Sequence, residues 1–187
     1  MNALANFLPL GGVKTGDVSA QYPSLFTPAP LTFAIWGAIY LLLAGFVLYQ
    51  AGWLDQGSGL GGEAAERIGG WFAAGCLFNI AWVFCWHFGQ LGLSVAMMFG
   101  LLLTLMAASR QSIRAGQTRR ERWLVRAPFS LYYGWITVAA IANMSTWLVK
   151  RGWDGWGLSP QTWTVLLLAI GAAIACAVVL LSRDWVY

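Results

Sequence analysis

Five long apolar stretches, separated by shorter polar segments, dominate the hydropathy pattern of this chain. They cover residues 31–50, 70–88, 91–109, 128–149 and 161–182 and contain no Asp or Glu. Each is close to the roughly 20 residues that an α-helix needs to cross a bilayer. No stretch alternates as a strand would, and a membrane span must satisfy its own backbone hydrogen bonds. The pattern predicts an all-α, polytopic transmembrane bundle with five spans.

Two prolines mark where the first and last spans are expected to start. Thr27 precedes Pro28, and Ser159 precedes Pro160, so each proline follows a residue able to cap a helix. Proline suits the first helical turn because its missing N–H needs no partner there. We expect the first span to begin between Pro28 and Leu31, and the last near Pro160.

Composition agrees with a membrane location. Hydrophobic residues make up 59% of the 187 residues and charged residues 10%, against roughly 25% charged residues in soluble domains. The three cysteines lie within apolar stretches and lack the spacing of a redox or zinc motif. We interpret them as small apolar residues on helix surfaces.

The distribution of Lys and Arg predicts an orientation. Six of the eleven basic residues lie in the predicted loop at residues 110–127. Placing that loop in the cytoplasm puts eight basic residues inside and leaves Lys14, Lys150 and Arg151 outside. The expected setting is a bacterial inner membrane, with anionic lipid headgroups as partners of the loop. No nucleic-acid recognition module accompanies the charge, so we expect no nucleic-acid partner.

The chain is expected to form a single membrane domain, residues 1–187. Within it we distinguish a loop or lid segment at 1–30, a four-helix core at 31–149 and an additional helix at 150–187. Residues 1–10 are too short to span, so a helix preceding Met1 and another following Tyr187 are both compatible with the pattern. An alanine stripe at residues 169, 173 and 177 is typical of helix packing. That stripe is compatible with a homodimer or with a partner in a membrane complex.

Few residues in the spans could carry chemistry. They hold no Ser-His-Asp set, carboxylate pair or metal cluster, so we expect no catalytic residue, no metal site and no enzyme. His87 is the one histidine. It is interpreted as an interfacial polar residue, with axial ligation of a metallated tetrapyrrole as the alternative.

Aromatic and amide side chains share helix faces in three spans. Trp36 and Tyr40 lie four residues apart, as do Trp82 and Trp86, and the fourth span presents Trp135, Asn143 and Trp147. Asn79 precedes Trp82 on the second span. A buried amide needs a partner, which is either a neighbouring helix or a ligand. Aromatic walls with a few polar anchors describe a pocket for a flat, lipophilic ligand, although helix packing would use the same residues.

These motifs resemble the translocator protein family, also called tryptophan-rich sensory proteins (TspO/MBR-like). Residues 26–30 (FTPAP) and 33–40 (FAIWGAIY) are similar to its Pro-rich loop and its F-x-x-V-W-T-x-L-Y helix. Residues 79–82 (NIAW) resemble its N-x-x-W motif, and Trp135, Asn143 and Trp147 its W-x7-N-x3-W spacing. The resemblance covers roughly residues 22–149 in the same order, and the fifth span extends beyond it. It marks a divergent branch of the family with at least one added helix.

The resemblance implies a helical bundle whose first loop covers a pocket for porphyrins, sterols or synthetic lipophiles. By motif, the residues that would line or support this pocket are Trp36, Tyr40, Asn79, Trp82, Trp135, Asn143 and Trp147. No cofactor is required, and a bound tetrapyrrole is compatible with the pocket. The leading hypothesis is a membrane receptor or carrier for a hydrophobic small molecule. The alternative is a structural or assembly subunit whose tryptophans pack helices.

Overall fold

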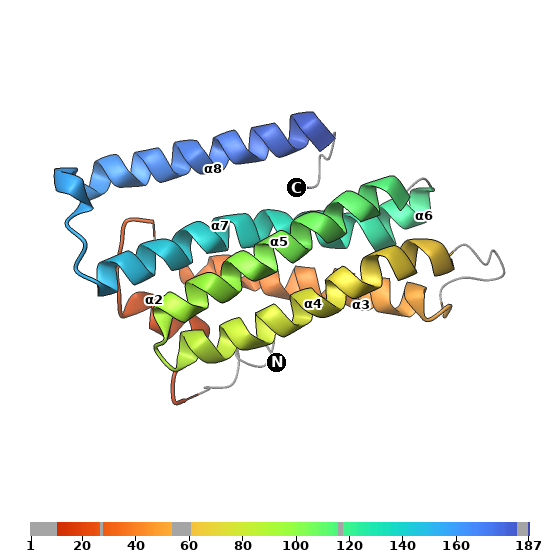
Figure 1. Ribbon diagram of the computed structural model, residues 1–187, viewed down its shortest axis with the longest axis horizontal. Coiled ribbons are helices and arrows are strands. Elements are labelled where there is room, and N and C mark those ends of the chain that lie inside the picture. Colours follow the sequence, from red (N-terminus) through yellow and green to blue (C-terminus); the bar gives the residue numbers. More distant parts are fainter. Residues whose placement is uncertain (1–10, 27, 54–60, 116–117, 183–186) are drawn as a thin grey trace.

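The computed structural model describes residues 11–26, 28–53, 61–115, 118–182 and 187. It contains five helices long and apolar enough to cross a membrane, which confirms the predicted helical membrane bundle. The long helices run roughly parallel or antiparallel, and α8 lies to one side of the others (Figure 1). The elements in chain order are α2 (Thr15–Ala20), the 3₁₀ turn η1 (Pro30–Ala34), α3 (Ile35–Gln50), α4 (Gly61–His87), α5 (Leu91–Ala115), α6 (Arg119–Glu121), the π turn η2 (Arg122–Arg126), α7 (Ala127–Lys150), the 3₁₀ turn η3 (Gly155–Gly157) and α8 (Pro160–Ser182).

Both spans start where the prolines predicted, the first at Leu31 and the last at Pro160. α8 begins at Pro160, and the hydroxyl of Ser159 accepts the backbone N–H of Thr162 at 3.1 Å, as expected of a cap. Before α3, however, Pro30 opens the turn η1, with Ala29 in the capping position. Thr27, the expected cap, lies outside the described residues.

The predicted basic loop at residues 110–127 is mostly helical. α5 continues through Arg110 and Arg114 to Ala115, and helical turns resume at Arg119. The hydroxyl of Thr118 accepts the N–H of Glu121 at 3.2 Å, and the Glu121 carboxylate accepts the N–H of Thr118 at 2.8 Å. This reciprocal pair is a capping box, and it starts the helical run that leads into α7. Polar composition had suggested a loop, but the capping pair favours helix.

The core lies between α3, α4, α5 and α7, where α5 packs against both α4 and α7. Phe46, Phe72 and Phe129 from three helices meet edge to face, with ring centroids 4.9–5.7 Å apart. Such contacts fill the half of the bundle nearest the arginines without polar atoms. The other half carries the tryptophans.

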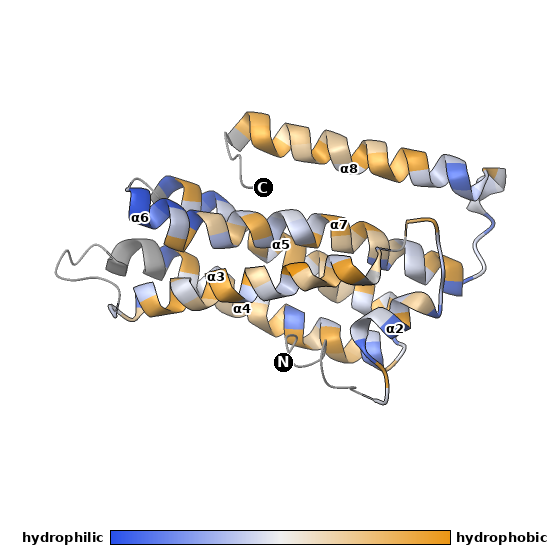
Figure 2. Ribbon diagram, turned by 180° about the vertical axis from the view of Figure 1, so that it is seen from behind, coloured by the Kyte–Doolittle hydropathy of each residue, from blue (hydrophilic) through white to orange (hydrophobic). Residues whose placement is uncertain are grey.

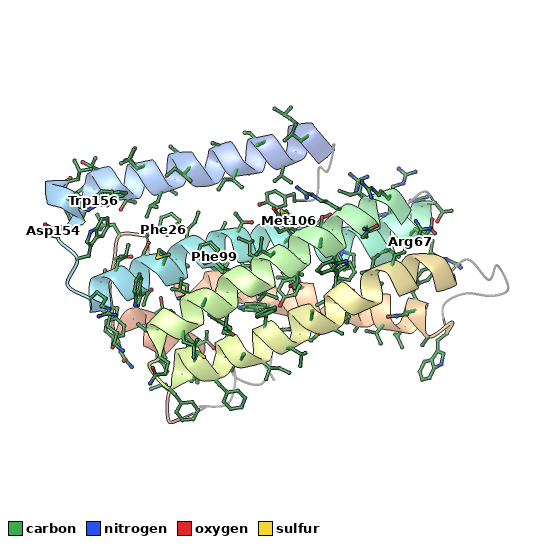
Figure 3. All side chains as sticks on the ribbon, viewed as in Figure 1. Phe26, Arg67, Phe99, Met106, Asp154 and Trp156 are labelled. Atoms are coloured by element: carbon green, nitrogen blue, oxygen red, sulfur yellow. The ribbon has the colours of Figure 1, made fainter. Side chains whose placement is uncertain are left out.

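The two ends of the bundle differ in charge. Arg67 lies at the end that carries the α6 arginines, and Asp154 and Trp156 lie at the opposite end (Figure 3). Hydrophilic residues gather around α6, whereas α8 is almost wholly hydrophobic between its ends (Figure 2). Lys150 belongs to the second end, where its ammonium donates to the carbonyl of Gly89 at 2.6 Å. This separation is what the orientation prediction requires, while the side of the membrane stays a prediction.

α8 is only loosely attached to the rest of the protein. None of the residues in its apolar 18-residue stretch is buried, against 44% of the corresponding stretch of α5 and 50% of that in the span that ends at Lys150. The connection from α7 to α8 contains Trp156, whose φ of 52° is left-handed. Trp153, Trp156 and Trp163 pack together there, with ring centroids 4.9–5.9 Å apart. The tryptophan contacts therefore hold the connection at the N-terminal end of α8. Most of the rest of the helix faces outward.

Candidate functional site

Trp36 on α3 is the centre of a buried aromatic cluster. Only 3% of its surface is exposed. Its ring stacks on Tyr40 one turn later, with centroids 5.6 Å apart, and faces Trp82 of α4 at 6.5 Å. Two rings of α7 meet it edge on, Tyr132 at 5.8 Å and Trp135 at 6.1 Å. The predicted aromatic faces of three helices therefore converge at one point.

The cluster continues toward the segment before α3. Trp86 stacks on Trp82, with centroids 5.8 Å apart, and its Nε1 donates to the carbonyl of Thr15 at 3.0 Å. Phe33 of η1 packs edge to face on Trp135 at 6.4 Å. The short helix α2 and the turn η1 thus cover the aromatic cluster at the end opposite the arginines.

Asn143 forms the polar centre of the site and connects three helices. Its side-chain oxygen accepts the Nε1 proton of Trp82 at 2.7 Å, and its amide nitrogen donates to the hydroxyl of Ser94 at 3.0 Å. The Ser94 hydroxyl in turn donates to the carbonyl of Leu91 at 2.7 Å. These contacts satisfy the buried amide inside the protein, so its oxygen is already used by α4 and α5.

Asn79 makes a second interhelical contact. Its amide donates to the hydroxyl of Tyr132 at 2.6 Å, which joins α4 to α7. Both asparagines singled out in the sequence therefore make the helix-to-helix hydrogen bond that was one of their two interpretations.

A cavity of about 40 Å³ lies within the cluster, which we call the aromatic pocket. It is lined by Thr15, Ser19, Pro28, Phe33, Trp36, Trp82, Trp86, Met98, Trp135, Ala139, Ala142, Asn143 and Thr146. Four of the seven predicted site residues belong to this lining: Trp36, Trp82, Trp135 and Asn143. The stacked rings fill most of the space, since pockets for drug-sized ligands hold roughly 300–1,000 Å³. The pocket is closed in this conformation.

The other three predicted site residues lie outside the lining. Tyr40 and Asn79 lie behind it, where Tyr40 stacks on Trp36 and Asn79 bonds Tyr132. Trp147 packs over α5, because a Cβ on Gly92 would lie 3.0 Å from its Nε1. These three residues support the walls from behind or from the side.

Two indole N–H groups of the aromatic pocket lack a hydrogen-bond partner within the described part of the chain. They are the Nε1 groups of Trp36 and Trp135, both buried. An unsatisfied buried donor costs about 1–3 kcal/mol, so such groups call for an explanation. A ligand with acceptor atoms would satisfy both.

Some lining residues gave no signal in the sequence. Thr15, Ser19 and Pro28 come from the segment before α3, and nothing in their spacing placed them over the tryptophans. Ala139, Ala142 and Thr146 share a face of α7 with Asn143. That helical spacing could have identified them, but small residues are too common in membrane helices for the spacing to single them out.

His87 is engaged at both ring nitrogens. Nδ1 lies 2.8 Å from the carbonyl of Val83, and Nε2 lies 3.4 Å from the hydroxyl of Thr15. Among the described residues no group of three or more His, Cys, Asp or Glu could hold a metal ion. The imidazole helps to hold α2 against the end of α4.

A second, larger cavity of about 290 Å³ lies between α7 and α8, and we call it the α7–α8 cleft. It is lined by Ile35, Leu131, Gly134, Trp135, Thr137, Val138, Gly171, Ala175 and Tyr187. Trp135 is part of the lining of both cavities. The indole of this residue therefore separates the closed aromatic pocket from the cleft.

The fold and the site define a polytopic helical membrane protein with a buried aromatic pocket covered by a short helix. The chain belongs to the TSPO-like protein family, whose model matches residues 1–187. This membership confirms the family that the sequence motifs predicted, and it indicates a membrane ligand-binding or sensory protein. Neither the curated proteins nor the solved structures contain a match.

Proposed function

We propose that this protein is a membrane receptor or carrier for a flat, hydrophobic ligand of the tetrapyrrole or sterol class, bound in the aromatic pocket. The observation that carries the proposal is the pair of indole donors, Trp36 and Trp135, that find no hydrogen-bond acceptor among the described residues around the aromatic lining. Rings supply stacking area, and the two N–H groups supply directional contacts to carboxylate or hydroxyl oxygens. No group in the pocket needs to react with the ligand.

Binding requires the pocket to open. The closed volume of about 40 Å³ is far below the size of such a ligand. The described part of the segment before α3 would act as a lid, since Thr15, Ser19 and Pro28 cover the tryptophans. Thr15 connects α2 to α4 through hydrogen bonds with Trp86 and with His87, and Val18 of α2 is buried in the core. Both hydrogen bonds are of modest strength, so their loss would be the first step of opening.

A titration with protoporphyrin IX tests this function. Ligand bound beside the tryptophans of the purified, detergent-solubilised protein should quench indole fluorescence to saturation. Trp36→Phe and Trp135→Phe keep a ring but remove the N–H, and each should weaken binding about 3- to 10-fold if that N–H meets the ligand. Trp123→Phe is the matched control, because Trp123 is 64% exposed near the arginine-rich end.

Linear quenching that is identical in all four proteins would mean that the porphyrin partitions into detergent, and the proposal would be abandoned for this ligand. Competition by a sterol distinguishes the two ligand classes. A sterol that displaces the porphyrin shares its site, whereas a sterol that leaves quenching unchanged restricts the pocket to the tetrapyrrole class.

A structural or assembly subunit is the second candidate. It is favoured by α8, none of whose span is buried, and by the use of Asn79 and Asn143 in interhelical hydrogen bonds. Stable co-purification with other membrane proteins, together with no saturable ligand, would support this role over the first.

A further inference from the structure

The α7–α8 cleft is the roomier of the two cavities, at about 290 Å³ against about 40 Å³ for the aromatic pocket. Its α7 wall carries Leu131, Gly134 and Val138, which share one helix face, and its α8 wall carries Gly171 and Ala175. Small residues on facing membrane helices normally allow the helices to touch. Here the backbone of Tyr187 lies against Gly134, and a space remains between the two helices beside it.

A cavity of this kind in a bilayer does not stay empty. An empty cavity forfeits the dispersion contacts of its walls, and water would find few polar partners among these side chains. The surrounding solvent at this depth is lipid hydrocarbon. The volume and the walls therefore suit an alkyl chain.

The hydroxyl groups of the cleft already have partners. The hydroxyl of Tyr187 lies 2.6 Å from that of Thr137, which also donates to the carbonyl of Tyr133 at 3.0 Å. A hydrocarbon chain would leave neither hydroxyl unsatisfied. This distinguishes the cleft from the aromatic pocket, where indole donors call for a ligand with oxygen atoms.

An arginine of α5 lies near the side of the cleft that Tyr187 lines. The ring of Tyr187 packs on that of Tyr133, with centroids 4.8 Å apart, and Tyr133 lies within the electrostatic reach of Arg110. Arg114 follows one turn later on α5. A basic site beside a crevice between membrane helices is complementary to an anionic lipid headgroup.

We propose that the α7–α8 cleft binds an acyl chain of an anionic phospholipid, with the headgroup against Arg110. The site is distinct from the aromatic pocket and does not depend on the ligand of that pocket. A bound lipid would also complete the packing of α8, whose own contacts with α7 are few.

Photolabelling of the full chain in phosphatidylcholine vesicles tests the proposal. The probe is a phosphatidylglycerol with a diazirine in its acyl chain, compared with a phosphatidylcholine that carries the same chain. The phosphatidylglycerol probe should label Leu131 and Val138 in excess of Leu103, which is 59% exposed on α5. The phosphatidylcholine probe should label these α7 residues more weakly.

Two pairs of variants test where the acyl chain and the headgroup of the lipid bind. Ala175→Phe fills the cleft and should reduce α7 labelling to the level of Leu103, whereas Ala173→Phe, on the exposed face of α8, should not. Arg110→Gln should remove the preference for phosphatidylglycerol, and Arg122→Gln, an exposed arginine at the same end, should keep it. Labelling of the α7 residues that equals that of Leu103 in the unmodified protein, or that is the same for both probes, overturns the proposal.

Discussion

The indole Nε1 of Trp82 on α4 donates a hydrogen bond of 2.7 Å to the side-chain oxygen of Asn143 on α7. Both residues are buried, and Ser94 of α5 bonds the same amide. Three helices are therefore joined at one polar point inside an apolar bundle. Because the lining of the aromatic pocket includes Trp82 and Asn143, the contact that fixes the helices also fixes part of the site.

Replacing Asn143 should destabilise the protein more than its size suggests. Asn143→Ala leaves the Trp82 N–H and the Ser94 hydroxyl without their shared partner, and we expect a loss of about 1–3 kcal/mol in unfolding free energy. Ser145→Ala is the matched control, since the Ser145 hydroxyl bonds the carbonyl of Ile141 in its own helix at 3.0 Å and joins no other helix among the described contacts of this region. Reversible unfolding in mixed micelles measures both. Equal stability of the two variants would show that the network contributes little.

Trp→Phe substitutions at two positions should separate the role of the N–H from that of the ring. Trp36 and Trp82 are 3% and 5% exposed, so the loss of volume is similar. Trp82→Phe removes a hydrogen bond, whereas Trp36→Phe removes a donor that has no partner in the described chain. We expect Trp82→Phe to be less stable by about 1 kcal/mol in the absence of ligand. The reverse order in thermal unfolding would contradict this assignment of the two indoles.

The spans could be predicted because membrane helices need long uncharged runs, and the chain has five. The sequence did not predict that α5 extends to Ala115, because a polar segment rich in arginine between two apolar stretches is typical of a loop. Long side chains can, however, keep their charge in the interface while the backbone stays helical. The spacing of Thr118 and Glu121 is that of a capping box, and this pattern indicates that a helix begins here.

Helical periodicity could predict only those site residues that share a face of one helix. The spacing of Trp36 to Tyr40 and of Trp82 to Trp86 placed rings on common faces, and these faces do meet. Periodicity within one helix cannot show how neighbouring helices turn, so it did not exclude Trp147 from the pocket. It also could not place Thr15, which lies in a separate short helix and reaches the site through contacts 71 and 72 residues apart in sequence.

A side chain at Gly100 should destabilise the protein. A Cβ built on it would overlap the ring of Phe78, closer than real Cβ contacts allow, so α4 and α5 depend on the missing side chain. We expect Gly100→Ala to cost about 1–3 kcal/mol through overpacking. Gly70→Ala is the control, because a Cβ there meets nothing within 4 Å, and a helix interior gains about 0.5–1 kcal/mol from alanine.

The two glycine variants should therefore shift the midpoint of thermal unfolding in opposite directions. Combining Gly100→Ala with Phe78→Leu should recover part of the loss, since the smaller side chain leaves room for the new methyl group. Additive effects of Gly100→Ala and Phe78→Leu would mean that the two sites are not in contact.

The attachment of α2 should control access to the aromatic pocket. Thr15→Val keeps the shape of the side chain but removes the hydroxyl that lies 3.4 Å from Nε2 of His87. With one hydrogen bond lost, amide hydrogen exchange in residues 15–20 should become about 3- to 10-fold faster. Thr164→Val, whose hydroxyl bonds the carbonyl of Pro160 in α8, should leave exchange in α2 unchanged. Unchanged exchange in Thr15→Val as well would show that the Trp86 bond to the Thr15 carbonyl is sufficient to hold the helix, and Trp86→Phe would then be the variant that releases it.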